Sequence, residues 1–244
     1  MAQHAPPARG ARLGRAAGAR TGSGSTESAV NGVVLLLPGA SRFSPGPMRP
    51  LARALARAGG PEGLVTHTVI HGGDSAREEQ AGWAADEAVR RYGDVPVCLV
   101  GYDAGGLAVL RAAGHGAVNS VVAIAPCLGA AARTDCPEPV KQLSGRQVLI
   151  VHGTNDARSD PEASFRLAAR AKKANRSTCR FEVHSDGHGL REHQPEVVAL
   201  AVDFVLGAVS SGRYSRPVTD ALAAPPPLGL RMPLASGFGR SLRR

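Results

Sequence analysis

The stretch from Val95 to Gly106 constrains the fold of this chain more than any other part of the sequence. It reads Val-Pro-Val-Cys-Leu-Val-Gly-Tyr-Asp-Ala-Gly-Gly, an apolar run that ends in a glycine-rich turn. Gly101 and Gly105 stand two places before and two places after Asp103. A strand that turns sharply into a helix needs glycines there, because side chains would collide in so tight a turn. The pattern predicts a strand, a nucleophile elbow and a helix, with Asp103 at the apex.

The rest of the chain alternates between apolar runs and helical patterns. Val33 to Leu37 is apolar throughout and bounded by Gly32 and Pro38, which is typical of a parallel strand buried on both faces. Besides the elbow strand, the predicted strands cover residues 33–37, 64–70, 120–125, 147–152 and 179–184, and the predicted helices cover 48–58, 75–92, 107–113, 161–174 and 195–209. This alternation predicts an α/β fold with a mostly parallel central sheet of about six strands and helices on both faces.

The basic charge of the chain is concentrated at its two ends. The net charge is +9, but ten of the 29 Lys and Arg residues and only two of the 20 Asp and Glu residues lie in residues 1–30 and 211–244. Both ends are rich in Ala, Gly, Pro, Ser and Arg, so we predict disordered basic tails around one folded domain over residues 31–210. That domain is nearly neutral, which argues against a nucleic-acid partner.

Three further expectations follow from composition. No run approaches the roughly 20 apolar residues of a membrane span, so we expect no membrane partner. The four cysteines (Cys98, Cys127, Cys136 and Cys179) are widely spaced without a CxxC pair, which favours reduced thiols and a cytoplasmic location. His184, His188 and His193 with Asp186 have no established ligand spacing, so neither a metal nor a cofactor is expected.

Two other polar segments follow predicted strands. His152-Gly153-Thr154-Asn155-Asp156 comes after the strand at 147–152, and Asp186-Gly187-His188-Gly189 comes after the strand at 179–184. Because the carboxyl ends of parallel strands meet at one edge of a sheet, Asp103, Asp156 and His188 are expected to converge there.

Together the three segments resemble the α/β-hydrolase family over about residues 31–209, in the family order of nucleophile, acid and histidine. The resemblance implies a catalytic set of Asp103, His188 and Asp156 acting on a small-molecule substrate. It also implies an oxyanion hole made of the backbone N–H groups of Ala40 and Ala104. Only 21 residues, 126–146, separate the fourth and fifth predicted strands, which leaves no room for a cap domain. The Gly-Tyr-X-X-Gly-Gly elbow in a capless chain is most similar to the dienelactone hydrolases, which have cysteine in place of Asp103.

An aspartate at the elbow restricts the chemistry. Attack of a carboxylate on an ester or amide carbonyl gives a mixed anhydride, whereas attack on carbon bearing an epoxide oxygen or another leaving group gives an ester that water hydrolyses. The epoxide hydrolases and haloalkane dehalogenases have aspartate at this position. Unlike them, this chain has Ala104 in place of a halide-binding tryptophan, Pro38 in place of a loop histidine, and no cap tyrosines.

Two other interpretations remain open at this point. Asp103 and His188 can act as an acid/base pair in a cyclisation, elimination or isomerisation. Alternatively, the chain is a ligand-binding protein without activity. Asp103 then occupies the elbow because aspartate is one of the few residues that tolerate a positive φ. Cys127 is either a thiol near the site or a packed apolar residue. The substrate and the oligomeric state are left undetermined.

Overall fold

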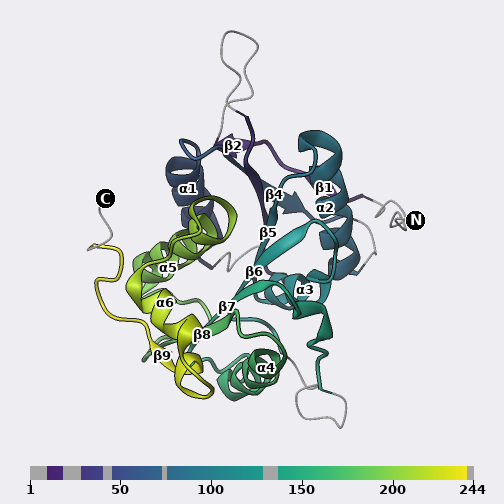
Figure 1. Ribbon diagram of the computed structural model, residues 1–244. Helices are drawn as coiled ribbons and strands as arrows, with labels where there is room; N and C mark the ends of the chain where they lie inside the picture. Colours follow the sequence, from purple (N-terminus) through teal and green to yellow (C-terminus); the bar gives the residue numbers. More distant parts are fainter. Residues whose placement is uncertain (1–9, 19–28, 41–45, 73–75, 129–136, 241–244) are drawn as a thin grey trace.

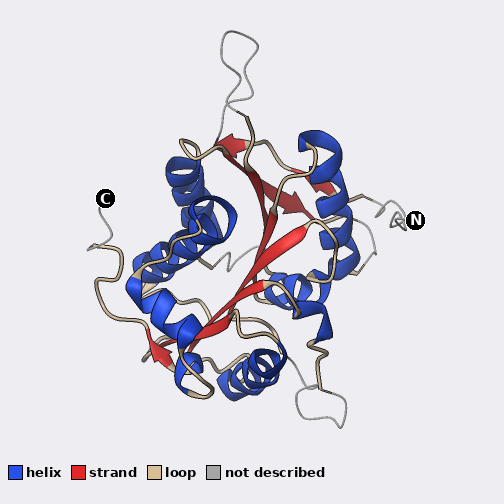
Figure 2. Cartoon of the chain, in the orientation of Figure 1, coloured by secondary structure: helices blue, strands red, loops and turns tan. Residues whose placement is uncertain are grey.

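A twisted, mostly parallel sheet lies between two layers of helices (Figures 1 and 2). The computed structural model describes residues 10–18, 29–40, 46–72, 76–128 and 137–240. Within these residues the sheet has nine strands: β1 (Arg12–Leu13), β2 (Ala17–Gly18), β3 (Gly32–Leu37), β4 (Leu64–Ile70), β5 (Val97–Tyr102), β6 (Val118–Ile124), β7 (Gln147–Gly153), β8 (Thr178–Val183) and β9 (Met232–Pro233).

The strand order places the elbow beside a reversal of chain direction across the sheet. The order is β1-β4-β3-β5-β6-β7-β8-β9, with β2 also paired to β4. All pairs from β4 to β9 are parallel, and the short β1 and β2 run antiparallel to β4. After β3 the chain forms β4 on one side and then crosses to form β5 on the other. Such a switch point opens a crevice at the carboxyl ends of the two central strands, where open α/β sheets bind ligands.

The helices cover both faces of the sheet. They are α1 (Met48–Gly59), α2 (Arg77–Tyr92), α3 (Ala104–Ala112), α4 (Pro161–Ala174), α5 (Gln194–Leu206) and α6 (Arg216–Ala223), with short 3-10 turns at Lys141–Leu143 and Leu228–Leu230 and a π-helical end at Gly207–Ser211. α1, α5 and α6 share one core cluster with alternate strand residues such as Leu36 and Val100. α2, α3 and α4 share the other with residues such as Leu35 and Leu99. Two buried faces explain why these strands read as continuous apolar runs.

The predicted fold is confirmed in its central part. The six predicted strands are β3 to β8, and the five predicted helices are α1 to α5, with ends that differ by a few residues. Ile124 ends β6 and Gln147 begins β7, and the only helical piece described between them is the turn at Lys141–Leu143. No cap domain therefore separates these strands.

The structure corrects the prediction of disorder in the N-terminal segment. Residues 10–18 lie along β4, where Arg12 pairs with Ile70 and Ala17 pairs with Thr66. The buried His67 adds a 2.8 Å hydrogen bond between its Nδ1 and the Gly14 carbonyl. The edge of β4 offers unpaired backbone groups, and this segment satisfies them although it has no apolar pattern of its own. Residues 1–9 and 19–28 lie outside the described part of the chain.

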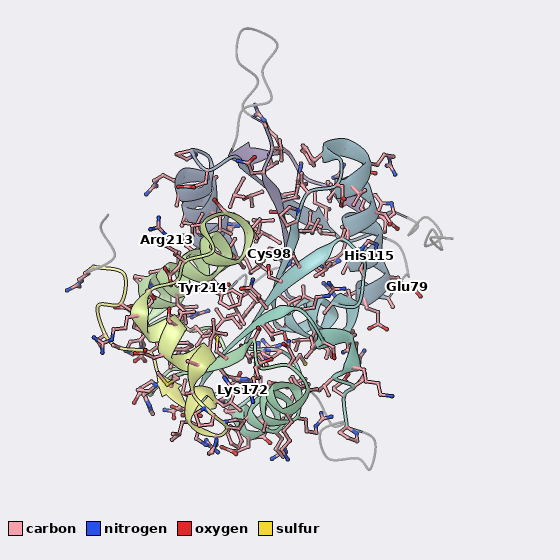
Figure 3. The ribbon with its side chains drawn as sticks, viewed as in Figure 1. Glu79, Cys98, His115, Lys172, Arg213 and Tyr214 are labelled. Carbon is pink, nitrogen blue, oxygen red and sulfur yellow. The ribbon has the colours of Figure 1, made fainter. Side chains whose placement is uncertain are left out.

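The prediction of a disordered C-terminal tail is also wrong for residues 211–240. α6 packs Val218 and Ala221 into the core, and β9 pairs with β8. The buried Lys172 of α4 donates from Nζ to the carbonyls of Thr178, Ala221 and Leu222. Figure 3 shows Lys172 where α4 meets the yellow C-terminal segment. The tail is ordered because it supplies acceptors for a buried cation, a role that its composition does not indicate.

One helical stretch among the described residues has the length and apolar composition of a membrane span. Gln194–Ser211 has a mean hydropathy of 1.3 over 18 residues. However, its residues Val197, Leu200 and Phe204 are fully buried in the core cluster on the α1, α5 and α6 face of the sheet. This is the packing of a core helix in a globular fold.

Candidate active site

Asp103 sits at the apex of a tight turn between β5 and α3. Its φ of 56° and ψ of −121° place it in the left-handed region that few side chains tolerate. A Cβ on Gly101 would lie 2.1 Å from the Gly105 carbonyl oxygen, and a Cβ on Gly105 would lie 2.0 Å from that of Leu37. Both positions therefore require glycine, and the turn has the geometry of a nucleophile elbow.

The structure brings together the three residues that the sequence places after separate strands. Asp156 follows β7, and His188 lies in the loop after β8. His188 Nδ1 lies 2.7 Å from Asp156 Oδ2, and His188 Nε2 lies 3.5 Å from Asp103 Oδ1. All three residues are buried. The imidazole is thus held between two carboxylates, with its Nδ1 proton assigned by the short bond to Asp156.

Backbone groups hold the acid and the histidine in place. Asp156 Oδ1 accepts the N–H groups of Arg158 at 2.8 Å and Ser159 at 3.0 Å. The buried carboxylate of Asp186 accepts three N–H groups of the histidine loop, those of Gly187, Arg191 and His193. In addition, the Tyr102 hydroxyl donates to the His188 carbonyl at 3.3 Å. These bonds fix the direction of the imidazole before any substrate arrives.

The oxyanion loop lies directly against the elbow. The Ala40 N–H donates to Asp103 Oδ2 at 3.4 Å, and a Cβ on Gly39 would lie 2.9 Å from the same oxygen. Ala104 is the first residue of α3, so its N–H has no acceptor within the helix. Of the two predicted oxyanion donors, the Ala40 N–H is thus directed at the carboxylate of Asp103 itself.

No family model and no curated protein matches this sequence. Among solved structures, an esterase from Pyrococcus furiosus superposes with a TM-score of 0.61 at 15% identity, over 74% of this chain and 84% of that one. Est1E from Butyrivibrio proteoclasticus with ferulic acid bound gives 0.63 at 16% identity, over 83% and 97%. A serine hydrolase without a lid from Xanthomonas campestris gives 0.57 at 16% identity, over 78% and 86%.

The chain has the α/β-hydrolase fold. The likeness to a serine hydrolase without a lid agrees with the short connection between β6 and β7. At these identities the superpositions establish the fold alone and leave the chemistry of the chain to the residues of the site.

The charges of Asp103, Asp156 and His188 depend on one another. Burial lowers the pKa of His188, but hydrogen bonds and charge from Asp103 and Asp156 outweigh it and raise the pKa to about 9. Burial likewise works against the charge of Asp103, and the His188 hydrogen bond and charge, with the Ala40 N–H, hold its pKa below the ordinary value. Burial also opposes the charge of Asp156, but hydrogen bonds from two histidines and two backbone N–H groups outweigh it and hold the pKa of this carboxyl well below its ordinary value. At neutral pH the site therefore holds an imidazolium between two carboxylates.

His152 is a member of the site that the sequence did not single out. Its Nε2 lies 3.0 Å from Asp156 Oδ2 and 3.1 Å from the Ser159 carbonyl oxygen, and its side chain is fully buried. It belongs to the segment that resembles the acid motif, but a histidine at the end of a strand carries no signal that distinguishes this position from ordinary packing.

Cys127 lies beside the elbow residue Asp103. It is half-buried, and its N–H donates to the Asp103 carbonyl at 3.0 Å. Burial and the charge of Asp103 raise the pKa of the thiol, which keeps it protonated. A thiolate nucleophile at Cys127 is therefore disfavoured.

A hollow opens beside the oxyanion loop. It has a volume of about 570 Å³ and is lined by the ends of β3 and β4 with parts of α1 and α2. Its lining includes Ala40 and Met48 as well as three basic side chains, Arg49, His71 and Arg77, and the described lining contains no carboxylate. Residues 41–45, 73–75 and 129–136 lie outside the described part of the chain.

The histidines considered as metal ligands do not converge with a third ligand. His193 Nδ1 lies 3.5 Å from Asp186 Oδ2, while His188 faces Asp103 and Asp156. Within the described ranges, no group of three His, Cys, Asp or Glu side chains has the spacing of a metal site.

Proposed function

We propose that this chain is a hydrolase in which Asp103 attacks a saturated carbon of a small organic substrate. The observation that carries the proposal is the placement of an ionised carboxylate at the elbow, 3.5 Å from a histidine that Asp156 holds. The leaving group is an epoxide oxygen or another group that departs from carbon. An alkyl-enzyme ester forms, and water activated by His188 then hydrolyses it.

The depressed pKa of Asp103 supports attack through its carboxylate. Burial opposes the charge, and contacts with His188 and Ala40 more than compensate for it, so the carboxylate is ionised over the physiological range. Oδ1 faces His188 and Oδ2 faces the Ala40 N–H. A bond from Oδ1 to substrate carbon leaves Oδ2 as the carbonyl oxygen of the ester. When water adds to that ester, negative charge develops on Oδ2, next to the Ala40 donor.

The proton balance of both steps can be met by His188. The raised pKa of about 9, which the two carboxylates impose against the effect of burial, means that His188 is protonated in the free site. As Asp103 Oδ1 bonds to an epoxide carbon and the C–O bond breaks, His188 gives its Nε2 proton to the leaving oxygen. His188 is then neutral. Because alkylation has removed the charge of Asp103, only Asp156 still favours its protonation. His188 then takes a proton from water as hydroxide adds to the ester carbon, and cleavage restores the carboxylate, the imidazolium and the diol product.

The hollow beside Ala40 supports a small substrate. A volume of about 570 Å³ suits a compact organic molecule, and Met48, Ala52 and Val69 give it an apolar wall. Arg49 and Arg77 disfavour a cationic substrate, because the described lining has no carboxylate to pair with one. A neutral or anionic compound is the better fit.

A second candidate function uses the same groups without a covalent bond. An imidazolium 3.5 Å from a carboxylate is also an acid/base pair for an elimination, cyclisation or isomerisation. A ligand-binding role without activity is less well supported, because His188 lies within hydrogen-bond distance of Asp156 and the pair is aimed at the elbow.

Labelling of Asp103 distinguishes these functions. A single turnover in ¹⁸O-water, with a panel of small epoxides and alkyl halides, is expected to place one heavy oxygen in the Asp103 carboxylate, detected by mass spectrometry of the elbow peptide. His188→Gln is expected to accumulate an alkyl adduct on that peptide with the halides, which need no proton to leave. Asp103→Asn is the control and gains no adduct. Turnover of any substrate without label or adduct on Asp103 would exclude the covalent route and favour acid/base catalysis.

A further inference from the structure

Two imidazoles meet on one carboxylate oxygen in this site. Asp156 Oδ2 lies 2.7 Å from His188 Nδ1 and 3.0 Å from His152 Nε2. His188 faces Asp103 with its other nitrogen, whereas His152 lies behind Asp156, on β7, with no exposed surface. His152 therefore does not reach a substrate and contacts the site through Asp156.

The contacts of His152 assign its protonation state. Its Nε2 lies 3.1 Å from the Ser159 carbonyl oxygen, which can only accept a hydrogen bond, so Nε2 carries a proton that Asp156 and Ser159 share. Its Nδ1 is buried and has no hydrogen-bond partner within the described ranges. Nε2 is thus the donor nitrogen of His152, shared between Asp156 and Ser159.

The remaining contacts of Asp156 show what His152 alters. Oδ1 is bonded to the N–H groups of Arg158 and Ser159, so among the described residues His152 is the one donor that competes with His188 for Oδ2. Each added donor stabilises the carboxylate charge and reduces the pull of that charge on the imidazolium. Without His152, the whole of Oδ2 would be available to His188.

We propose that His152 is a positioning residue that orients the Asp156 carboxylate and weakens its hold on the His188 proton. The consequence for turnover rests on the proposed function. His188 must release a proton as Asp103 is alkylated and then act as a base, and a carboxylate that binds the imidazolium too tightly would delay both events.

Other charged groups around His188 set the background for this effect. Asp103 lies across from it on the elbow, Tyr102 of β5 packs against its ring, and the charge of the exposed Arg158 acts on Asp103. On its own loop, Asp186, Arg191 and Glu192 line a small hollow with it. All of these are retained when only His152 is changed, so a shift can be assigned to His152.

Titration of the imidazoles by NMR tests the proposal without any substrate. In the wild-type chain, Nε2 of His152 is expected to carry the proton that it shares with Asp156 and Ser159. In His152→Phe, which keeps an aromatic ring and removes the donor, the His188 midpoint is expected to rise by about half a unit to one unit. His152→Gln keeps an N–H donor and is expected to leave the midpoint within about 0.3 unit of the wild type.

Several results would overturn the proposal. These are a wild-type His152 that carries its proton on Nδ1 with none on Nε2, a folded His152→Phe chain with an unchanged or lowered His188 midpoint, and a His152→Gln chain that shifts as far as His152→Phe. The wild-type measurement decides the question should His152→Phe fail to fold.

The link to turnover has its own readout. With an alkyl halide, the rate of ester hydrolysis is expected to rise with pH, and in His152→Phe that rise is expected to move to higher pH by the shift seen in the titration. A titration shift without any alkyl-enzyme ester would support the role of His152 and contradict the proposed function. An ester whose hydrolysis has the same pH dependence in both chains would contradict the role of His152 in turnover.

Discussion

The N–H of Ala40 donates to Oδ2 of Asp103, 3.4 Å away. An N–H in the oxyanion loop is thereby directed at the carboxylate of the elbow residue. The two oxygens of Asp103 are consequently distinguished, with Oδ1 toward His188 and Oδ2 toward the backbone donor. This asymmetry suits a carboxylate that attacks through one oxygen and develops charge on the other in the following step.

Asp103→Ser is expected to convert the site into a weak esterase. The serine hydroxyl would face His188, the Ala40 N–H would become available to a substrate oxyanion, and the loss of one carboxylate would lower the His188 pKa from about 9 toward its ordinary value. Release of p-nitrophenol from p-nitrophenyl acetate should exceed that of Asp103→Ala by roughly a hundredfold, the usual contribution of a positioned base.

The double variant Asp103→Ser with His188→Gln is the control and should lose this gain. A folded Asp103→Ser chain no faster than Asp103→Ala would show that Ala40 and His188 are not placed for acyl transfer.

The raised pKa of His188 is expected to make stability fall on the alkaline side. A group whose folded-state pKa exceeds its unfolded value stabilises the fold fully below the unfolded value and loses that contribution as pH rises through the folded value. For His188 the window runs from about 6.5 to about 9. The melting temperature of the wild type should therefore decline more steeply across this window than that of His188→Gln, as measured by calorimetry. Parallel curves for the two chains would contradict the raised pKa.

Gly105→Ala is expected to destabilise the chain by about 3 kcal/mol, because the added Cβ would lie 2.0 Å from the Leu37 carbonyl oxygen. Gly82 provides a matched control, since it also lies in a helix and a Cβ there meets no atom within 4 Å. Gly82→Ala should stabilise the chain by roughly 0.5 to 1 kcal/mol through helix propensity. Chemical denaturation measures the free energy of unfolding of both variants. A Gly105→Ala chain as stable as the Gly82→Ala chain would show that the elbow is not tightly packed.

Lys172→Met is expected to loosen the C-terminal segment. Nζ of Lys172 donates to three backbone carbonyls, two of them at the end of α6, and methionine would leave these buried acceptors without a partner. A loss of about 2 kcal/mol or more, with faster amide exchange in α6, is the expected result.

Lys173→Met is the neighbouring control, because Lys173 is exposed and its replacement should change stability by less than about 0.5 kcal/mol. Equal amide exchange in α6 of the two variants would mean that Lys172 does not hold this segment.

Much of the fold and part of the site were predictable because their signals are local. Continuous apolar runs such as Val33–Leu37 indicate strands buried on both faces, and the glycines around Asp103 indicate the elbow. The positions of Asp156 and His188 just after strands predicted that they converge with Asp103, since parallel strands end at one edge of the sheet. These inferences need only the periodicity of the chain and the geometry of its turns.

The tertiary structure alone decided which distant groups meet. Residues 10–18 and 211–240 are ordered because the edge of β4 and the buried Lys172 need their backbone groups, although their composition is typical of disorder. Likewise, His152 shares Asp156 Oδ2, and the Cys127 N–H donates to the Asp103 carbonyl, through contacts that no local pattern encodes. The sequence by itself determined the sheet, the elbow and the order of the site residues. The hydrogen-bond partners and the charge states of the site residues were decided only by the folded chain. A hydrogen bond depends on the positions of two groups, and a sequence pattern describes only one of them.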